Sequence, residues 1–90
     1  MTRRPVATTR AHPFGPSAGP ALFTVNPGVP IHDALQCASS MLGCVHELVI
    51  TISDGDIRGQ EIFAVQYLTE MAKALVDSSS EGVWDKERAQ

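Results

Sequence analysis

The two cysteines are the first candidates for chemistry, because their spacing decides whether they can form a disulfide. Cys37 and Cys44 are seven positions apart, which on a helix places them on one face, about 10.5 Å apart along the axis. A disulfide needs Cα atoms within about 7 Å, so these two thiols cannot pair within one helix. Cys37 could meet Cys44 of a second, antiparallel chain, but we interpret both as small buried residues at the edge of an apolar face.

The histidines and serines lack the partners that metal binding or nucleophilic catalysis requires. His32 and His46 are 14 positions apart, which is about 21 Å on a straight helix and too far for one ion. His12 falls in a separate segment, and the Cys-x-x-Cys and His-x-x-x-His pairs typical of metal sites are missing. Ser39 and Ser40 have no evident base. We therefore expect no catalytic residue, no metal and no cofactor, and predict that the protein is not an enzyme.

The charge changes sign along this 90-residue chain, whose length allows one small domain. Residues 1–30 carry +3 and no acid, residues 31–78 carry −5, and the net charge is −3. An acidic body is not expected to bind nucleic acid, because lysine and arginine contacts to phosphate supply most of that affinity. The longest apolar runs are a few residues, against about 20 for a membrane span. We therefore expect a cytoplasmic protein that does not enter a membrane.

Apolar residues recur with helical spacing in two segments. From Ile31 to Ile52 they are 4, 3, 4, 3, 4 and 3 positions apart, which predicts a helix over about 31–52. The turn formers of residues 53–56 end this helix, and a second one is predicted over about 57–77. The predicted fold class is therefore all-α, an antiparallel helical hairpin.

The segments outside the hairpin differ in composition. The proline-rich residues 1–20 show no apolar periodicity and predict a disordered basic arm. A transit peptide is the alternative for this arm, although the amphipathic pattern of one is missing. Residues 22–25, Leu-Phe-Thr-Val, predict a short strand or an extended segment. The predicted helical-hairpin domain then covers residues 21–78, and residues 79–90 form a flexible C-terminal tail.

The apolar faces of the two predicted helices are wider than one partner helix covers. They span about 180° and 220° when residues are placed at 100° per position. We expect a second copy to cover the remainder, so that two hairpins form a four-helix bundle. The predicted core and dimer-interface residues are Leu35, Ala38, Met41, Leu42, Val45, Leu48, Val49, Phe63, Tyr67, Leu68, Met71 and Leu75. On this interpretation Leu42→Asp unfolds the chain.

A monomer is the alternative to this dimer. Its arm and tail would then cover the open apolar faces, with the side chains of Leu22, Phe23, Val25 and Trp84.

Several short runs resemble a family of short proteobacterial proteins of unknown function, common in pseudomonads. The resemblance covers roughly residues 22–78, and it is carried by Pro27-Gly28-Val29-Pro30, Asp33-Ala34-Leu35, Ala38-Ser39, Leu42 and Tyr67-Leu68-Thr69-Glu70-Met71-Ala72-Lys73-Ala74-Leu75-Val76. It implies a bacterial, cytoplasmic and mainly helical protein. The family has no assigned reaction, cofactor or catalytic residue to carry over.

The wide apolar faces favour a non-catalytic protein-interaction or regulatory module that acts on an unidentified protein partner. A small DNA-binding regulator is the alternative, because strand, helix, helix is the element order of ribbon–helix–helix repressors. Against it, Thr24 is the one polar side chain in the predicted strand, and both helices are long for that fold. A third hypothesis is a bundle that binds a small molecule along the edge formed by Cys37 and Cys44.

Overall fold

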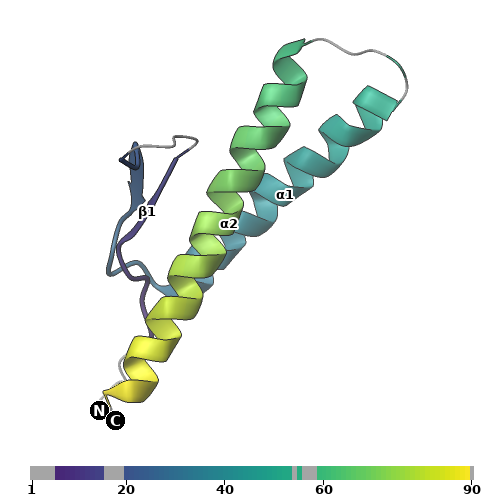
Figure 1. Cartoon of the computed structure of the whole chain (residues 1–90). Coiled ribbons are helices and arrows are strands. Elements are labelled where there is room, and N and C mark those ends of the chain that lie inside the picture. The colour runs from purple at the N-terminus through teal and green to yellow at the C-terminus, as the bar shows by residue number, and fades with distance from the viewer. Residues whose placement is uncertain (1–5, 16–19, 54, 56–58, 90) are drawn as a thin grey trace.

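The computed structural model describes residues 6–15, 20–53, 55 and 59–89 of the chain. Its elements follow the order β1 (His12–Phe14), β2 (Phe23–Val25), α1 (Ile31–Ser53) and α2 (Gly59–Arg88). The two helices run antiparallel and pack against each other, and the two strands lie beside α2 (Figure 1). The predicted helical hairpin with a short N-terminal strand is confirmed.

The first helix begins and ends close to the predicted positions. The backbone N–H groups of Asp33 and Ala34 donate to the carbonyl oxygen of Pro30, at 3.0 and 3.2 Å, and so close the first turn of α1. Asp33 lies in that turn, where the helix dipole favours a negative charge. Ala34 and Ala38 are the buried residues of this helix, and they allow the two helix axes to approach.

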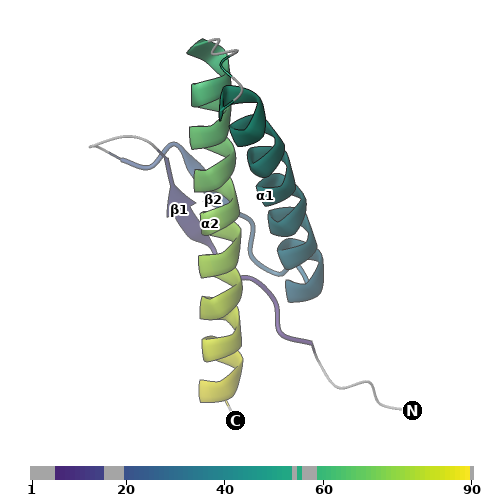
Figure 2. The same ribbon diagram turned by 90° about the vertical axis from the view of Figure 1, so that its right-hand side faces the viewer.

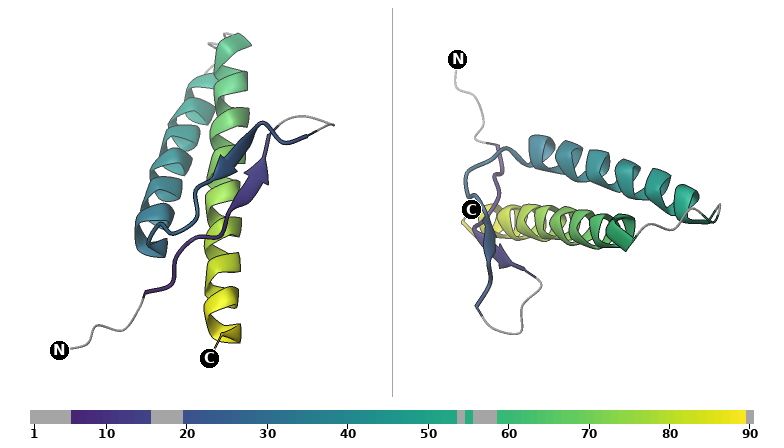
Figure 3. Two further views of the ribbon diagram at one scale, coloured as in Figure 1. Left: turned by 90° about the vertical axis from the view of Figure 1, so that its left-hand side faces the viewer. Right: turned by 90° about the horizontal axis from the view of Figure 1, so that it is seen from above.

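The strands form a two-stranded antiparallel ribbon that contacts α2. Phe14 of β1 is opposite Phe23 of β2 in the register, and their rings stack with centroids 5.5 Å apart and an interplanar angle of 29°. Among the described residues the ribbon contacts α2 and has no contact with α1. Figures 2 and 3 show the ribbon against the flank of α2 that faces away from α1.

Residues 7–10, which we name the docking segment, run antiparallel to the segment that leads into α1. The N–H of Thr9 donates to the carbonyl oxygen of Val29 at 2.9 Å, and the N–H of Gly28 donates to that of Thr9 at 3.0 Å. The N–H of Ile31 donates to the carbonyl oxygen of Ala7 at 3.2 Å. These backbone bonds tie the start of α1 to the N-terminal part of the chain.

The same segment lies directly on α2. The hydroxyl of Ser78 donates to the carbonyl oxygen of Arg10 at 2.5 Å, and the N–H of Arg10 donates to the carbonyl oxygen of Ser78 at 3.3 Å. One turn further along α2, a Cβ atom at Gly82 would overlap the carbonyl group of Thr8. Glycine at this position therefore allows the backbone of the docking segment to touch the backbone of the helix.

The structure differs from the predicted arm and tail. Residues 7–10 dock on α2 and residues 12–14 form β1, where a disordered arm over residues 1–20 was expected, and residues 1–5 and 16–19 of that arm lie outside the described residues. The second helix continues to Arg88, through the expected tail. Serine and glycine at positions 78–82 resemble a helix end in sequence, but Ser78 and Gly82 are the residues of α2 that contact the docking segment.

Gly82→Ala tests whether this close approach holds in solution. Alanine at a glycine position in a helix interior normally stabilises by about 1 kcal/mol. Here the added methyl group displaces the docking segment, and overpacking of this kind costs about 1–3 kcal/mol. We expect Gly82→Ala to lower the free energy of unfolding measured in urea.

Gly43→Ala is the matched control for this substitution. Gly43 lies within α1, and nothing lies within 4 Å of the methyl group that alanine would add. This variant is expected to be more stable than the parent chain. Stabilisation of similar size by both substitutions would contradict the docking of residues 7–10 on α2.

Candidate interaction surfaces

A polar cluster fastens the ribbon and the docking segment to the C-terminal half of α2. The guanidinium of Arg10 donates two hydrogen bonds to the carboxylate of Asp85, at 2.8 and 2.6 Å, and its third nitrogen lies 3.7 Å from Glu81. The Nδ1 atom of His12 is 2.9 Å from Oε1 of Glu81, and its Nε2 atom is 4.0 Å from Asp77. These charged groups hold segments together and are paired with one another.

The ion pair between Arg10 and Asp85 also shifts the pKa of both groups. The hydrogen bonds from Arg10 lower the pKa of Asp85, and the hydrogen bond to Asp85 raises the pKa of Arg10. On the same helix, the hydrogen bond to Asp77 raises the pKa of Lys73. The histidine, cysteine and acidic side chains of the described residues include no group of three that could hold a metal ion.

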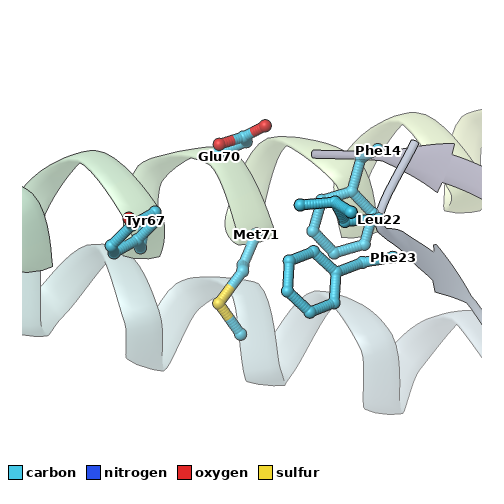
Figure 4. Close-up of a pocket in the computed structure, with 6 residues that line it drawn as sticks. All are labelled: Phe14, Leu22, Phe23, Tyr67, Glu70 and Met71. Carbon is cyan, nitrogen blue, oxygen red and sulfur yellow. The ribbon is translucent and has the colours of Figure 1, made fainter. Parts of the chain in front are cut away.

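An aromatic pocket lies between the ribbon and α2 (Figure 4). It has a volume of about 310 Å³, and the rings of Phe14 and Phe23 form one of its walls. Tyr67 lies on the opposite side, and Glu70 stands at the rim. The residues that line the pocket are Phe14, Leu22, Phe23, Tyr67, Glu70 and Met71.

A second apolar surface extends along both helices. Large aliphatic side chains recur every seven positions on α1, and those of α2 lie fourteen and then seven positions apart, with Thr69 at the intervening position. All are 39% to 51% exposed. We name this surface the aliphatic face; its residues are Leu35, Leu42, Val49, Ile62, Val76 and Val83.

One groove joins the two halves of the aliphatic face. It has a volume of about 250 Å³ and is lined by Ile31 and Leu35 of α1 and by Val76, Ser79, Ser80 and Val83 of α2. Because residues seven apart lie on the same flank of a helix, Leu42 and Val49 extend this surface along α1. Tyr67 and Val76 are nine positions apart, which is half a turn around α2, so the aromatic pocket and the aliphatic face lie on opposite flanks.

The predicted core and interface residues divide into two groups in the structure. Those between the helices are buried or half-buried: Ala38, Met41, Val45, Leu48, Leu68 and Leu75. The others are exposed in the isolated chain: Leu35, Leu42, Val49, Phe63, Tyr67 and Met71. The two groups therefore differ in how far the isolated chain covers them.

The cysteines are placed differently from the prediction. Cys37 and Cys44 are free, exposed thiols, so their interpretation as buried residues is wrong. Cys37 is two positions from Leu35, about 160° around the helix, and therefore lies on the other flank of α1. Their seven-residue spacing does not distinguish a buried helix flank from an exposed one.

The sequence also contains one pattern typical of serine hydrolases. Residues 15–19, Gly-Pro-Ser-Ala-Gly, have the Gly-x-Ser-x-Gly spacing of a nucleophile elbow. Such an elbow joins a strand to a helix, whereas this pattern joins β1 to β2. Residues 16–19 lie outside the described part of the chain.

One helix of the described chain is long and apolar enough to cross a membrane. An 18-residue window of α1 has a mean hydropathy of 1.4, and 6% of that window is buried. A helix in the core of a soluble protein can have the same length and composition, so these properties alone do not place α1 in a bilayer. The small buried share of this window does show that the rest of the chain leaves most of α1 uncovered.

The arrangement defines a small helical-hairpin protein with two apolar surface features, the aromatic pocket and the aliphatic face. The sequence model described as "Protein of unknown function (DUF3077)" matches residues 7–82, and the chain belongs to this family. No curated protein and no solved structure matches the chain. The expected resemblance to an uncharacterised family is confirmed, while the proteobacterial origin stays a prediction.

The matched region begins and ends at two segments that touch each other. It starts at Ala7 in the docking segment and ends at Gly82 on α2, where the backbone of Thr8 lies against the helix. The sequence analysis did not predict this contact. The signal for it in the sequence was Gly82, a glycine that is followed by residues able to continue the helix. The aromatic pocket was missed as well, because the predicted arm hid the strand that carries Phe14.

Acidification tests the ion pair that holds the docking segment. Because the folded pKa of Asp85 lies below its ordinary value of 3.8, the pair stabilises docking above that pH and is lost as the pH falls through the lower, folded value. We expect the amide of Arg10, which donates to Ser78, to lose hydrogen-exchange protection on acidification. Protection factors, normalised to the intrinsic rate at each pH, measure this.

Asp85→Asn provides the reference for that measurement. It removes the charge but keeps the shape, so protection at Arg10 should already be reduced at neutral pH and should change less on acidification. Equal protection at this amide in the parent chain and in Asp85→Asn, at neutral pH, would show that the pair does not hold the segment.

Proposed function

We propose that this protein is a non-catalytic interaction module in which two hairpins pack their aliphatic faces into a four-helix bundle. The observation that carries the proposal is the aliphatic face itself. It presents six large aliphatic side chains, at positions seven or fourteen apart on each helix, all of them 39% to 51% exposed. Full burial of such a side chain contributes roughly 1.5–3 kcal/mol, and because each is already about half buried in the hairpin, covering it with a second copy contributes about half of that.

The small core of the isolated hairpin supports the same proposal. Its fully buried apolar residues are Val25 and the alanines at positions 34, 38, 72 and 74. Burial of an alanine removes little apolar surface from water. Domains are normally built from two packed layers of secondary structure around a shared core. Here the shortest principal extent of the Cα trace is 15 Å. A second hairpin would supply the missing layer.

The seven-residue spacing indicates how the layers would pack. In helical bundles, side chains with this repeat insert into spaces between four side chains of the facing helix. The groove beside Leu35 and Val83 has Ser79 and Ser80 among its lining residues, and small residues there leave room for a side chain of the second copy. The pairing is isologous, with the same face used by both chains.

The DNA-binding alternative receives less support from the described residues. In a ribbon–helix–helix dimer each chain contributes one strand to a shared ribbon, whereas β2 pairs with β1 of its own chain. Arg10, which is the basic residue nearest to the ribbon on its N-terminal side, is bound to Asp85. An interaction with proteins therefore fits the surface better than an interaction with phosphates.

Leu42→Asp tests the dimer. Leu42 is 48% exposed in the isolated hairpin, so the helices should form, contrary to the unfolding expected from sequence, while the carboxylates destabilise the interface. Loss of the leucine from both chains of the dimer should weaken association at least about 10-fold. Light scattering after size exclusion should give twice 9.7 kDa for the parent chain and 9.7 kDa for the variant.

Ser40→Asp is the control, because Ser40 is exposed and lies two positions from Leu42, about 160° around the helix. This variant should remain dimeric. Since a dissociated hairpin can also unfold, the thermal midpoint of the parent chain is measured at several concentrations and should rise with concentration. A concentration-independent midpoint, a parent chain of 9.7 kDa, or recovery of the chain with lipid vesicles would contradict the proposal.

A further inference from the structure

The aromatic pocket is independent of the aliphatic face and has the composition of a small-molecule site. Its volume of about 310 Å³ is at the lower end of the roughly 300–1,000 Å³ typical of ligand pockets. Five of its six lining residues are aromatic, aliphatic or methionine, and the sixth is Glu70. Pockets of this kind, with many apolar walls and one charged group, both enclose a ligand and orient it.

The walls of the pocket expose aromatic rings to whatever enters. The stacked rings of Phe14 and Phe23 form one wall, and Figure 4 shows Met71 between these rings and the ring of Tyr67. Phe23 and Tyr67 are 56% and 50% exposed. The face of an aromatic ring carries partial negative charge and attracts cations.

Glu70 adds a full negative charge at the rim, and no described residue neutralises it. Among the described residues, no hydrogen bond or ion pair involves its carboxylate. Lys73 is three positions further along α2, within reach on a helix, but its ammonium bonds instead to Asp77 at 2.7 Å. The guanidinium of Arg10 is likewise bound to Asp85. The nearby basic side chains are thus engaged with other acids.

We infer that this pocket binds an organic cation, a molecule with an ammonium group on an apolar body. The apolar body lies against Phe14, Leu22 and Phe23. The ammonium group lies near the ring of Tyr67 and the carboxylate of Glu70, so that ring and carboxylate together replace part of its hydration. A neutral apolar ligand would leave the carboxylate of Glu70 without a counter-charge.

The test compares a cation with its neutral isostere. Benzyltrimethylammonium and neopentylbenzene have the same shape and differ in one atom, nitrogen or carbon, and therefore in charge. Each is titrated into the full chain, and binding is followed by the backbone amide shifts of Tyr67, Glu70 and Met71. The quaternary ammonium has no N–H to donate, so its attraction to the carboxylate is electrostatic, and we expect Glu70→Gln to weaken binding of the cation about 5- to 10-fold. The same substitution should leave binding of the isostere unchanged within about two-fold.

Two further variants separate the pocket from the rest of the surface. Tyr67→Leu keeps an apolar wall but removes the ring, and it should weaken binding of the cation by about three-fold or more. Phe63→Leu makes a comparable change one turn earlier on α2, outside the pocket lining, and Glu47→Gln removes an exposed acid of α1. Both controls should bind the cation as the parent chain does.

Three results would overturn the inference. They are the absence of saturable shifts with the cation at millimolar concentration, equal effects of Glu70→Gln on both ligands, and shifts centred away from the pocket. Because the pocket and the aliphatic face occupy opposite flanks of α2, Glu70→Gln and Tyr67→Leu should leave the mass in solution unchanged. Failure of the dimer and failure of the pocket are therefore distinguishable.

Discussion

The contact between the docking segment and α2 determines how the rest of the chain is arranged. Backbone touches backbone at Gly82, and the hydroxyl of Ser78 is bonded to the carbonyl oxygen of Arg10. The other edge of the docking segment is bonded to the residues that lead into α1. One short segment thus fixes the end of α2 relative to the beginning of α1, and the ribbon that follows it is placed against α2.

This contact requires small residues, and small residues bury little apolar surface. The C-terminal half of α2 therefore contributes Ser78, Ser79 and Gly82 to the interior, while α1 contributes Ala34 and Ala38. The larger side chains, such as Leu42 and Val76, point outward. In the proposed dimer, covering the aliphatic face with a second copy would supply the stability that this interior of small residues does not. The aromatic pocket, on the opposite flank of α2, remains available to a ligand.

Sequence periodicity predicted the hairpin because apolar spacing reports directly on which helix flank is covered. It did not predict the end of α2, because serine and glycine are found both at helix ends and where a second backbone approaches. The low apolar content of residues 1–20 predicted a disordered arm. Composition carries no information on backbone hydrogen bonds, such as that from Thr9 to Val29, which hold part of this segment in place. The exposed residues of the candidate site, such as Leu42, were predicted because the apolar faces are wider than one helix covers. The pocket was not predicted, because it depends on β1.

The most direct test of the central claim is an isotope-filtered nuclear Overhauser experiment on a mixture of labelled and unlabelled chains, which detects contacts between copies alone. Two hairpins packed through their aliphatic faces should give intermolecular signals among the methyl groups of that face, with Leu42 and Val76 among them. Intermolecular signals confined to Phe63 and Tyr67, or none at concentrations where the chain is folded, would contradict it.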